Sequence, residues 1–241
     1  MLSVDQVTVK RGKATALSDI SLTIEAGKTL AVVGESGAGK STLIATILGL
    51  LPPTEGTVTW AGAPVRSCRP ALVMQEPRAA FNPALSLRRS VLEPVRARKA
   101  PVPTDRIKRL CQGLELPLDL LDRRPGEVSI GQAQRVGILR ALVAASPLIL
   151  FDEPLSALDA VTQKHTARLI QELQAEEGFT ALIVTHDLGY ACAFSDKIAV
   201  LRSGRIEEDG ASKGFVAAPQ TEYGRSLRDA AISLGALEVA S

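Results

Sequence analysis

Apolar and polar residues alternate along the first part of the chain, which is the period of half-buried β-strands. The alternation continues through residues 16–24, and Arg11-Gly12-Lys13 supplies a turn between the two segments. Two antiparallel strands are therefore expected at the start of the chain. The apolar positions of the first strand are Leu2, Val4, Val7 and Val9.

The next segments predict a strand, a turn and a helix in succession. Residues 29–33 form a short, β-branched apolar run of the kind that marks a buried strand. A glycine-rich turn follows, and the apolar stretch 42–51 then predicts a helix that two prolines stop at 52 and 53. Residues 56–60 return to the strand pattern.

Between residues 78 and 146 the pattern changes, because Pro, Arg and Leu dominate and the apolar spacing becomes helical. We interpret this stretch as an inserted helical subdomain, with amphipathic helices at 90–95 and 105–116. Apolar strands follow at 148–151 and 180–185, with a helix between them at 160–177. Strand–helix–strand order predicts a parallel sheet. Residues from 217 onward have a helical pattern.

Composition narrows the class of protein. The chain has 241 residues, is 46% hydrophobic and carries 28 Lys and Arg against 26 Asp and Glu. This near balance provides no field that would favour nucleic acid as a partner. No run approaches the ~20 apolar residues that cross a bilayer, and the first residues do not resemble a signal peptide. We expect a cytoplasmic protein that meets a membrane only through a partner.

The strongest chemical signal is a glycine-rich segment that fits the pattern GxxxxGK[ST]. Glycines let backbone amides surround a phosphate, and the helix that follows presents its positive end to the anion. Lys40 is expected to reach the β- and γ-phosphates of ATP, and the Ser41 hydroxyl to bind Mg²⁺. A plain turn with a solvated lysine is disfavoured, because the required strand and helix flank the loop. The expected ATP-binding residues here are Gly34, Glu35, Ser36, Gly37, Ala38, Gly39, Lys40, Ser41 and Thr42.

Acidic residues end one apolar strand and a histidine ends another. Residues 148–151 lead into Asp152 and Glu153, which places both carboxylates at the edge of the sheet where ligands of open α/β folds bind. Asp152 would bind Mg²⁺, and Glu153 would polarise the attacking water. His186 closes the strand 181–185, where it could sense the γ-phosphate. Each signal is weak alone, and the phosphate loop strengthens both.

Together these segments resemble the ATP-binding-cassette (ABC) family across essentially the whole chain. Their order matches: the phosphate loop, Gln75 after the strand 71–74, the stretch 128–135, the Asp-Glu strand, residues 156–159 and His186. The stretch 128–135 is similar to the family signature LSGGQ. The resemblance implies an α/β fold of the P-loop NTPase class, with a parallel-sheet nucleotide-binding core, an antiparallel β subdomain and an inserted helical subdomain. It implies one domain over 1–241, with the core and β subdomain in 1–77 and 147–216, the helical subdomain in 78–146 and a tail in 217–241.

The resemblance also assigns roles to further residues. Such domains work in pairs, with two ATP molecules between the phosphate loop of one and the signature of the other. By resemblance, Gln75 links the metal and water to a transmembrane partner, and Asp159 communicates between the two sites. The signature residues expected to face the partner's ATP are Ser129, Gly131 and Gln132.

Two positions depart from the family pattern. Ile130 replaces the first glycine of the signature, and a β-branched residue resists backbone angles that glycine allows. This predicts two unequal sites, with the site of Lys40, Glu153 and His186 the more active. Arg11 occupies the position that usually offers an aromatic ring to adenine. Either its guanidinium stacks on the base, or it is an exposed turn residue and adenine is held by apolar contacts.

Two segments indicate a branch of the family. Residues 75–83 are similar to the QDPxxxLNP stretch of oligopeptide, dipeptide and nickel importers, and residues 219–227 resemble the PxHPYTxxL tail of that branch. The chain stops without a cysteine-bearing extension, which favours import of a nickel or other metal chelate, or of a small peptide. The expected partners are permease subunits, a sister ATPase and, indirectly, an extracytoplasmic solute-binding protein, at the cytoplasmic face of the membrane. The alternative is a soluble ABC-type ATPase in an enzyme complex such as one for phosphonate breakdown.

Overall fold

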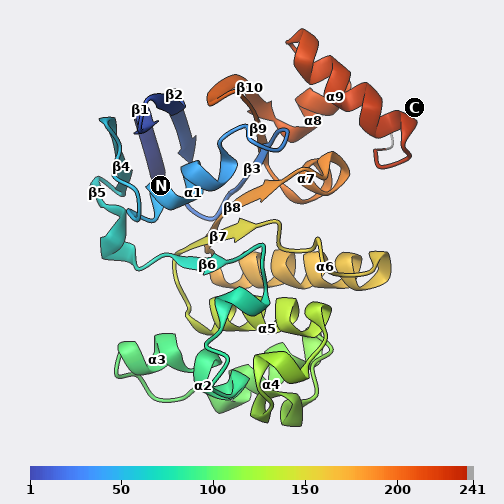
Figure 1. Cartoon of the computed structure of the whole chain (residues 1–241). Helices are drawn as coiled ribbons and strands as arrows, with labels where there is room; N and C mark the ends of the chain where they lie inside the picture. The colour runs from blue at the N-terminus through green and yellow to red at the C-terminus, as the bar shows by residue number, and fades with distance from the viewer. Residues whose placement is uncertain (238–241) are drawn as a thin grey trace.

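The centre of the molecule is a six-stranded sheet in which five neighbouring strands run parallel and β10 is an antiparallel edge. The computed structural model describes residues 1–237. Figure 1 shows this sheet running through the upper half of the molecule. Its strands, in spatial order, are β10 (Arg205–Ala211), β9 (Lys197–Arg202), β3 (Thr29–Val33), β8 (Thr180–Thr185), β7 (Leu148–Asp152) and β6 (Ala71–Val73).

A second sheet is antiparallel and packs beside the first. Its order is β2 (Ala14–Ile24), β1 (Leu2–Arg11), β4 (Glu55–Trp60) and β5 (Ala63–Pro64). The alternation read from the sequence sets its register, because apolar residues such as Val9 and Leu17 pair across β1 and β2 and are buried.

Helices divide into two groups. The group on the sheets comprises α1 (Lys40–Ile47), α6 (Ala160–Glu177), α7 (Leu188–Phe194), α8 (Ser212–Ala217) and α9 (Glu222–Ser233). The segment between β6 and β7 forms a lower helical lobe in Figure 1, with α2 (Leu87–Val91), α3 (Glu93–Ala97), α4 (Thr104–Gly113) and α5 (Ile130–Val143). Short 3-10 helices lie at Val65–Cys68, Arg78–Ala80, Leu118–Asp122 and Pro125–Glu127.

The central strands are buried on both faces, which explains why they are continuous apolar runs. In β3, Ala31 and Val33 belong to the hydrophobic cluster that includes the helical lobe. Leu30 and Val32, which point the other way, belong to the cluster that includes the antiparallel sheet and α1. The parallel sheet thus lies between two cores and ties the helical lobe to the antiparallel sheet.

The structure corrects several boundaries expected from the sequence. The helix expected at 42–51 begins at Lys40 and ends at Ile47, because Gly49 takes a left-handed conformation that turns the chain. The helix expected at 90–95 is two helices that meet at Leu92. The break lies just before Pro94, which has no backbone N–H to donate and is tolerated in the first turn of the second helix. The edge pair β9 and β10 was not predicted.

The part of the chain that the structure describes contains no helix that is both long enough and apolar enough to span a membrane.

Phe151 is the largest fully buried side chain of the described residues, and it lies in β7 directly before the two carboxylates. We predict that Phe151→Ala lowers the free energy of unfolding by about 3–5 kcal/mol, through lost burial and the cavity left behind. Urea unfolding followed by circular dichroism measures this change. Leu50→Ala, at a side chain that is 74% exposed, is the control and should change stability by less than about 0.5 kcal/mol. A similar midpoint for both variants would contradict this view of the core.

Candidate nucleotide site

The phosphate loop connects β3 to α1 and is held by contacts that only glycine allows. Gly39 precedes α1 in a left-handed conformation with φ 112°. A Cβ on Gly39 would lie 2.9 Å from the Ala16 carbonyl oxygen, and one on Gly34 would collide with the Leu201 carbonyl. The amide of Gly204 also donates to the Ala38 carbonyl at 2.9 Å. Backbone from both sheets therefore fixes the shape of the loop.

Lys40 folds back over this loop. Its ammonium donates to the carbonyl oxygens of Gly34 at 2.7 Å and Glu35 at 2.9 Å. Burial lowers the pKa of Lys40, while the carboxylates of Glu153 and Asp152 act in the opposite direction. The one lysine of the loop is thus already held near two carboxylates, at the start of a helix whose first amides face the same space.

A pocket of about 430 Å³ collects most of the residues that the sequence singles out. Four separate segments of the chain contribute to it, since residues at the ends of β3, β6, β7 and β8 meet at the carboxyl edge of the sheet. Gly34, Glu35 and Ala38 lie in the loop but do not line the pocket. The lining residues are Ser36, Gly37, Gly39, Lys40, Ser41, Thr42, Gln75, Asp152, Glu153 and His186.

Asp152 and Glu153 end β7 in different environments. Asp152 is partly buried, and burial raises its pKa, as does the Glu153 carboxylate, while Lys40 lowers it. Glu153 is only 6% exposed and has a left-handed backbone with φ 47°. Its amide donates to the Val184 carbonyl at 2.9 Å, so the neighbouring strand β8 holds this unusual turn in place.

Hydrogen bonds from the end of β8 fix the Glu153 carboxylate. The backbone amide of His186 donates to Oε1 at 3.0 Å, and the imidazole Nδ1 lies 2.8 Å from the same oxygen. The Thr185 hydroxyl donates to Oε2 at 3.2 Å. The His186 side chain is 71% exposed, so it connects a buried carboxylate with the open pocket. Thr185 is a site residue that the sequence reading missed.

The donors in the pocket suit a magnesium ion. Ser41, Gln75 and Asp152 offer a hydroxyl, an amide and a carboxylate in the lining of this pocket. Within residues 1–237 no group of three or more His, Cys, Asp or Glu is arranged to hold a metal alone. Mg²⁺ usually needs one or two carboxylates together with waters and substrate phosphates, so this sparse oxygen set fits it.

The signature residues lie outside this pocket, at the start of α5. Ser129 and Gln132 form a reciprocal capping box: Ser129 Oγ accepts from the Gln132 amide at 3.1 Å, and Gln132 Oε1 accepts from the Ser129 amide at 2.9 Å. A Cβ on Gly131 would lie 3.3 Å from the Ala157 carbonyl oxygen, so α5 packs closely on the loop before α6. The helix start that would face a partner is thus held from within the chain.

Ile130 does not distort the signature as the sequence suggested. It is the first residue of α5, and it is absent from the residues with positive φ. A β-branched residue adopts this helical backbone without strain, so the backbone argument for two unequal sites is wrong. The difference from glycine that remains at position 130 is the isoleucine side chain, which is 54% exposed beside Gly131.

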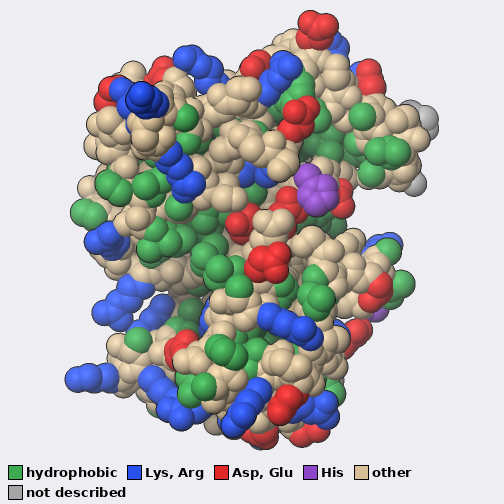
Figure 2. All heavy atoms as spheres, viewed as in Figure 1, with side chains coloured by type: hydrophobic (Ala, Val, Ile, Leu, Met, Phe, Trp, Pro, Cys, Tyr) green, Lys and Arg blue, Asp and Glu red, His purple; other side chains and the backbone are tan. Residues whose placement is uncertain are grey.

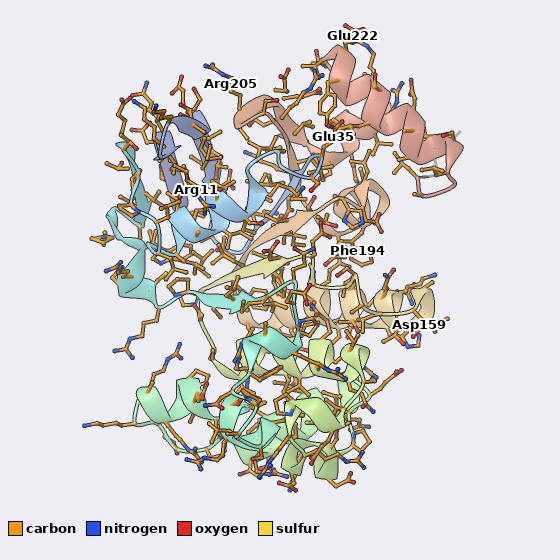
Figure 3. All side chains as sticks on the ribbon, viewed as in Figure 1. Arg11, Glu35, Asp159, Phe194, Arg205 and Glu222 are labelled. Atoms are coloured by element: carbon orange, nitrogen blue, oxygen red, sulfur yellow. The ribbon has the colours of Figure 1, made fainter. Side chains whose placement is uncertain are left out.

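Asp159 and Arg11 do not reach the pocket. Asp159 caps α6, where its carboxylate accepts from the Thr162 amide at 3.0 Å and the Thr162 hydroxyl at 2.7 Å. These bonds, with that of the Val161 amide, hold the pKa of Asp159 below its usual value. Arg11 is exposed at the end of β1 and is not a lining residue. Figure 3 shows both residues far from each other. Stacking of Arg11 on adenine stays a prediction.

Gln134 is a second residue that the sequence reading missed. It is 1% exposed inside α5, and its Nε2 donates to the Pro154 carbonyl at 2.8 Å, directly after Glu153. The same amide lies 3.5 Å from the Met74 carbonyl, directly before Gln75. One buried amide therefore joins the signature helix to both loops of the pocket. The signal in the sequence was a polar residue within an otherwise apolar helix face.

Comparison with known proteins agrees with this geometry. The family model described as ABC transporter matches residues 17–156. The chain is 34% identical to the oligopeptide transport ATP-binding protein OppF of Escherichia coli over 229 residues, which cover 89% of this chain and 69% of the relative. A putative peptide import ATP-binding protein of Brucella ovis is also 34% identical, over 89% of this chain and 72% of its own length.

Solved structures of ATP-binding cassettes also resemble this chain. The dimeric post-hydrolysis state of the ATP-binding cassette MJ0796, bound to ADP and Pi, superposes with a TM-score of 0.80 and 31% identity. That match covers 88% of this chain and 99% of the other. A family model over more than half of the chain, relatives above 30% identity and a site with the expected constellation lead to one conclusion: the chain belongs to the ABC transporter family and is an ATPase of this type.

Proposed function

We propose that this chain is the ATP-hydrolysing subunit of a peptide importer, and that the pocket at Lys40 is its Mg-ATP site. The observation that carries the proposal is the meeting of Lys40, Asp152 and Glu153 in one pocket at the carboxyl edge of the sheet. The ABC relatives described above are named for peptide transport or peptide import, which favours peptides over the nickel or other metal chelate that the sequence left open. The same names favour transport over a soluble enzyme complex.

In the proposed reaction, the chain's own groups orient the triphosphate and the water. The loop amides and Lys40 bind the phosphates, and Lys40 exchanges its bonds with Gly34 and Glu35 for phosphate oxygens. Mg²⁺, held by Ser41, Gln75 and Asp152, would neutralise charge on the phosphates when bound. Glu153 polarises the water and accepts its proton as the water oxygen bonds to the γ-phosphorus, while ADP leaves with the electron pair of the broken P–O bond. His186 orients Glu153 through their contact at 2.8 Å and faces the γ-phosphate.

A complete site needs a second cassette. Ser129, Gly131 and Gln132 start a helix outside this chain's own pocket, so they are available to an ATP on a partner. The dimeric MJ0796 cassette is a solved precedent for paired cassettes. We propose that the partner is a sister ATPase, and that Asp159, at the cap of α6, passes information between the two sites.

A groove between β6, α3 and α5 suits the transmembrane partner. It measures about 410 Å³ and is lined by Arg69, Arg98 and Arg140 with Glu93 among small apolar residues. Figure 2 shows Lys and Arg side chains on the left flank, where the upper and lower lobes meet. We propose that a short permease helix binds here, beside the strand β6 that leads to Gln75, with the cassette at the cytoplasmic face of the membrane. A solute-binding protein would act on the permease from the other side.

Lys40→Ala tests the nucleotide site. Removing the cation that faces the phosphates should reduce ATP affinity and turnover to a small fraction of those of the unaltered chain, while the fold is kept. Binding of a fluorescent ATP analogue measures the affinity, phosphate release measures the turnover, and circular dichroism of the same sample checks the fold. Lys213→Ala, at an exposed lysine of α8, is the matched control and should bind normally. Unchanged ATPase activity in a folded Lys40→Ala variant would overturn the site.

Glu153→Gln separates binding from chemistry. The amide keeps the shape of the side chain but is a poor base, so ATP affinity should persist while hydrolysis slows by roughly 10²-fold or more. Single-turnover hydrolysis measures the rate, and Glu172→Gln, at an exposed glutamate of α6, is the control. Undiminished hydrolysis would mean that another group activates the water.

The isolated chain should be a poor ATPase, because its pocket lacks a signature from a second subunit. Specific activity should rise with protein concentration or after addition of a sister cassette. Turnover strictly proportional to protein concentration, and unaffected by a partner, would show that one chain holds a complete site.

A further inference from the structure

Part of the chain between β6 and α2 lies along the signature helix α5. Residues 74–81, here termed the Gln75 segment, leave β6 and descend toward the helical lobe in Figure 1. At the start of this segment, the buried Gln134 amide of α5 lies 3.5 Å from the Met74 carbonyl oxygen. That distance is at the limit of a hydrogen bond, so α5 holds this end of the segment only weakly.

The other end of the Gln75 segment is held on α5 by Arg140. The Arg140 guanidinium donates to the Ala80 carbonyl at 2.6 Å and lies 4.8 Å from the centre of the Phe81 ring, a cation–π distance. Phe81 is buried and belongs to the hydrophobic cluster that includes the helical lobe. Because a charged donor makes a stronger hydrogen bond than a neutral one, this end of the segment has a fixed position on α5.

The middle of the segment reaches the start of α5 through Arg78. The Arg78 guanidinium donates to the Val128 carbonyl at 2.6 Å, and the two residues are 50 positions apart in the sequence. Val128 is buried and directly precedes Ser129, the residue that caps α5. A charge-assisted hydrogen bond therefore connects the Gln75 segment with the residue that leads into the signature.

The first turn of α5 directs its own amides elsewhere. The Ala133 amide donates to the Ser129 carbonyl at 2.9 Å, and the Gln132 amide donates to the Ser129 hydroxyl at 3.1 Å. Since these amides are occupied, the Arg78 guanidinium supplies the donor for the Val128 carbonyl. Arg78 does not line the nucleotide pocket of its own chain. Its contact thus acts on the signature and not on the pocket at Lys40.

We propose that Arg78 is a positioning residue for the signature: its bond to the Val128 carbonyl sets the place of Ser129 against the ATP of a second cassette. Arg140 lines the groove proposed for the permease helix and holds the far end of the same segment. The place of Ser129 is therefore tied to the occupant of that groove. This inference rests on the proposed pairing of cassettes in a transporter.

Hydrogen exchange of the chain alone tests the contact. Arg78→Met keeps an apolar stem and removes the donor, so the amides of residues 129–133 should exchange about tenfold faster, the size of one charge-assisted hydrogen bond. The unfolding midpoint and the binding of a fluorescent ATP analogue should not change. Arg78→Lys keeps a charged donor and should restore slow exchange. Arg168→Met, at an exposed arginine of α6, is the control and should exchange as the unaltered chain does.

Turnover of the assembled transporter tests the consequence. With the permease subunits and the sister cassette present, Arg78→Met should lower kcat for Mg-ATP roughly twofold or more, because at least one of the two sites loses an aligned signature. The KM for ATP should not change, since both phosphate loops are intact. Arg78→Lys should recover most of the lost turnover, and Arg78→Ala replaces Arg78→Met if the latter folds poorly.

Three results would overturn the inference. The first is unchanged exchange of residues 129–133 in folded Arg78→Met. The second is unchanged kcat of the assembled transporter, and the third is a rise in the KM for ATP with kcat unchanged. An unaltered transporter that hydrolyses no ATP would instead overturn the proposed function.

Discussion

Close backbone packing around the phosphate loop is the constraint on which the rest of the site depends. Gly34 lies against the Leu201 carbonyl of β9, and Gly39 lies against the Ala16 carbonyl of β2. One contact comes from the parallel sheet and the other from the antiparallel sheet. The loop can therefore take its shape only when both sheets are packed, which couples phosphate binding to the whole upper half of the molecule.

Strand register then brings the proposed catalytic groups to the loop. Val33, at the end of β3, pairs with Thr185 of β8, and Asp152 of β7 pairs with Val184 of the same strand. The three parallel strands end together, so the loop, the two carboxylates and His186 meet at one edge. The buried amide of Gln134 adds the signature helix to this arrangement through Pro154. The pocket and the signature helix are thus joined by short polar contacts rather than by long flexible segments.

The sequence predicted the loop, the Asp-Glu strand and the parallel core, because these depend on local pattern and on chain order. It missed features that depend on tertiary contacts. The helical backbone of Ile130 follows from the Ser129 cap, and the early end of α1 follows from the conformation of Gly49. The hydrogen bond between the Thr185 hydroxyl and the Glu153 carboxylate joins residues 32 positions apart, so no local pattern reveals it. The apolar run of β9 is itself of the kind that marks a buried strand, so local pattern alone could have predicted this strand.

Hydrogen exchange at the loop tests the central claim, that residues 34–42 bind the triphosphate, most directly. Backbone amides that donate hydrogen bonds to phosphate oxygens exchange their hydrogens slowly with solvent. The account therefore predicts protection of this segment on addition of Mg-ATP. Adenosine at equal occupancy should leave these amides unprotected, because it lacks phosphates. Protection by Mg-ATP elsewhere in the chain, with residues 34–42 unchanged, would contradict the account.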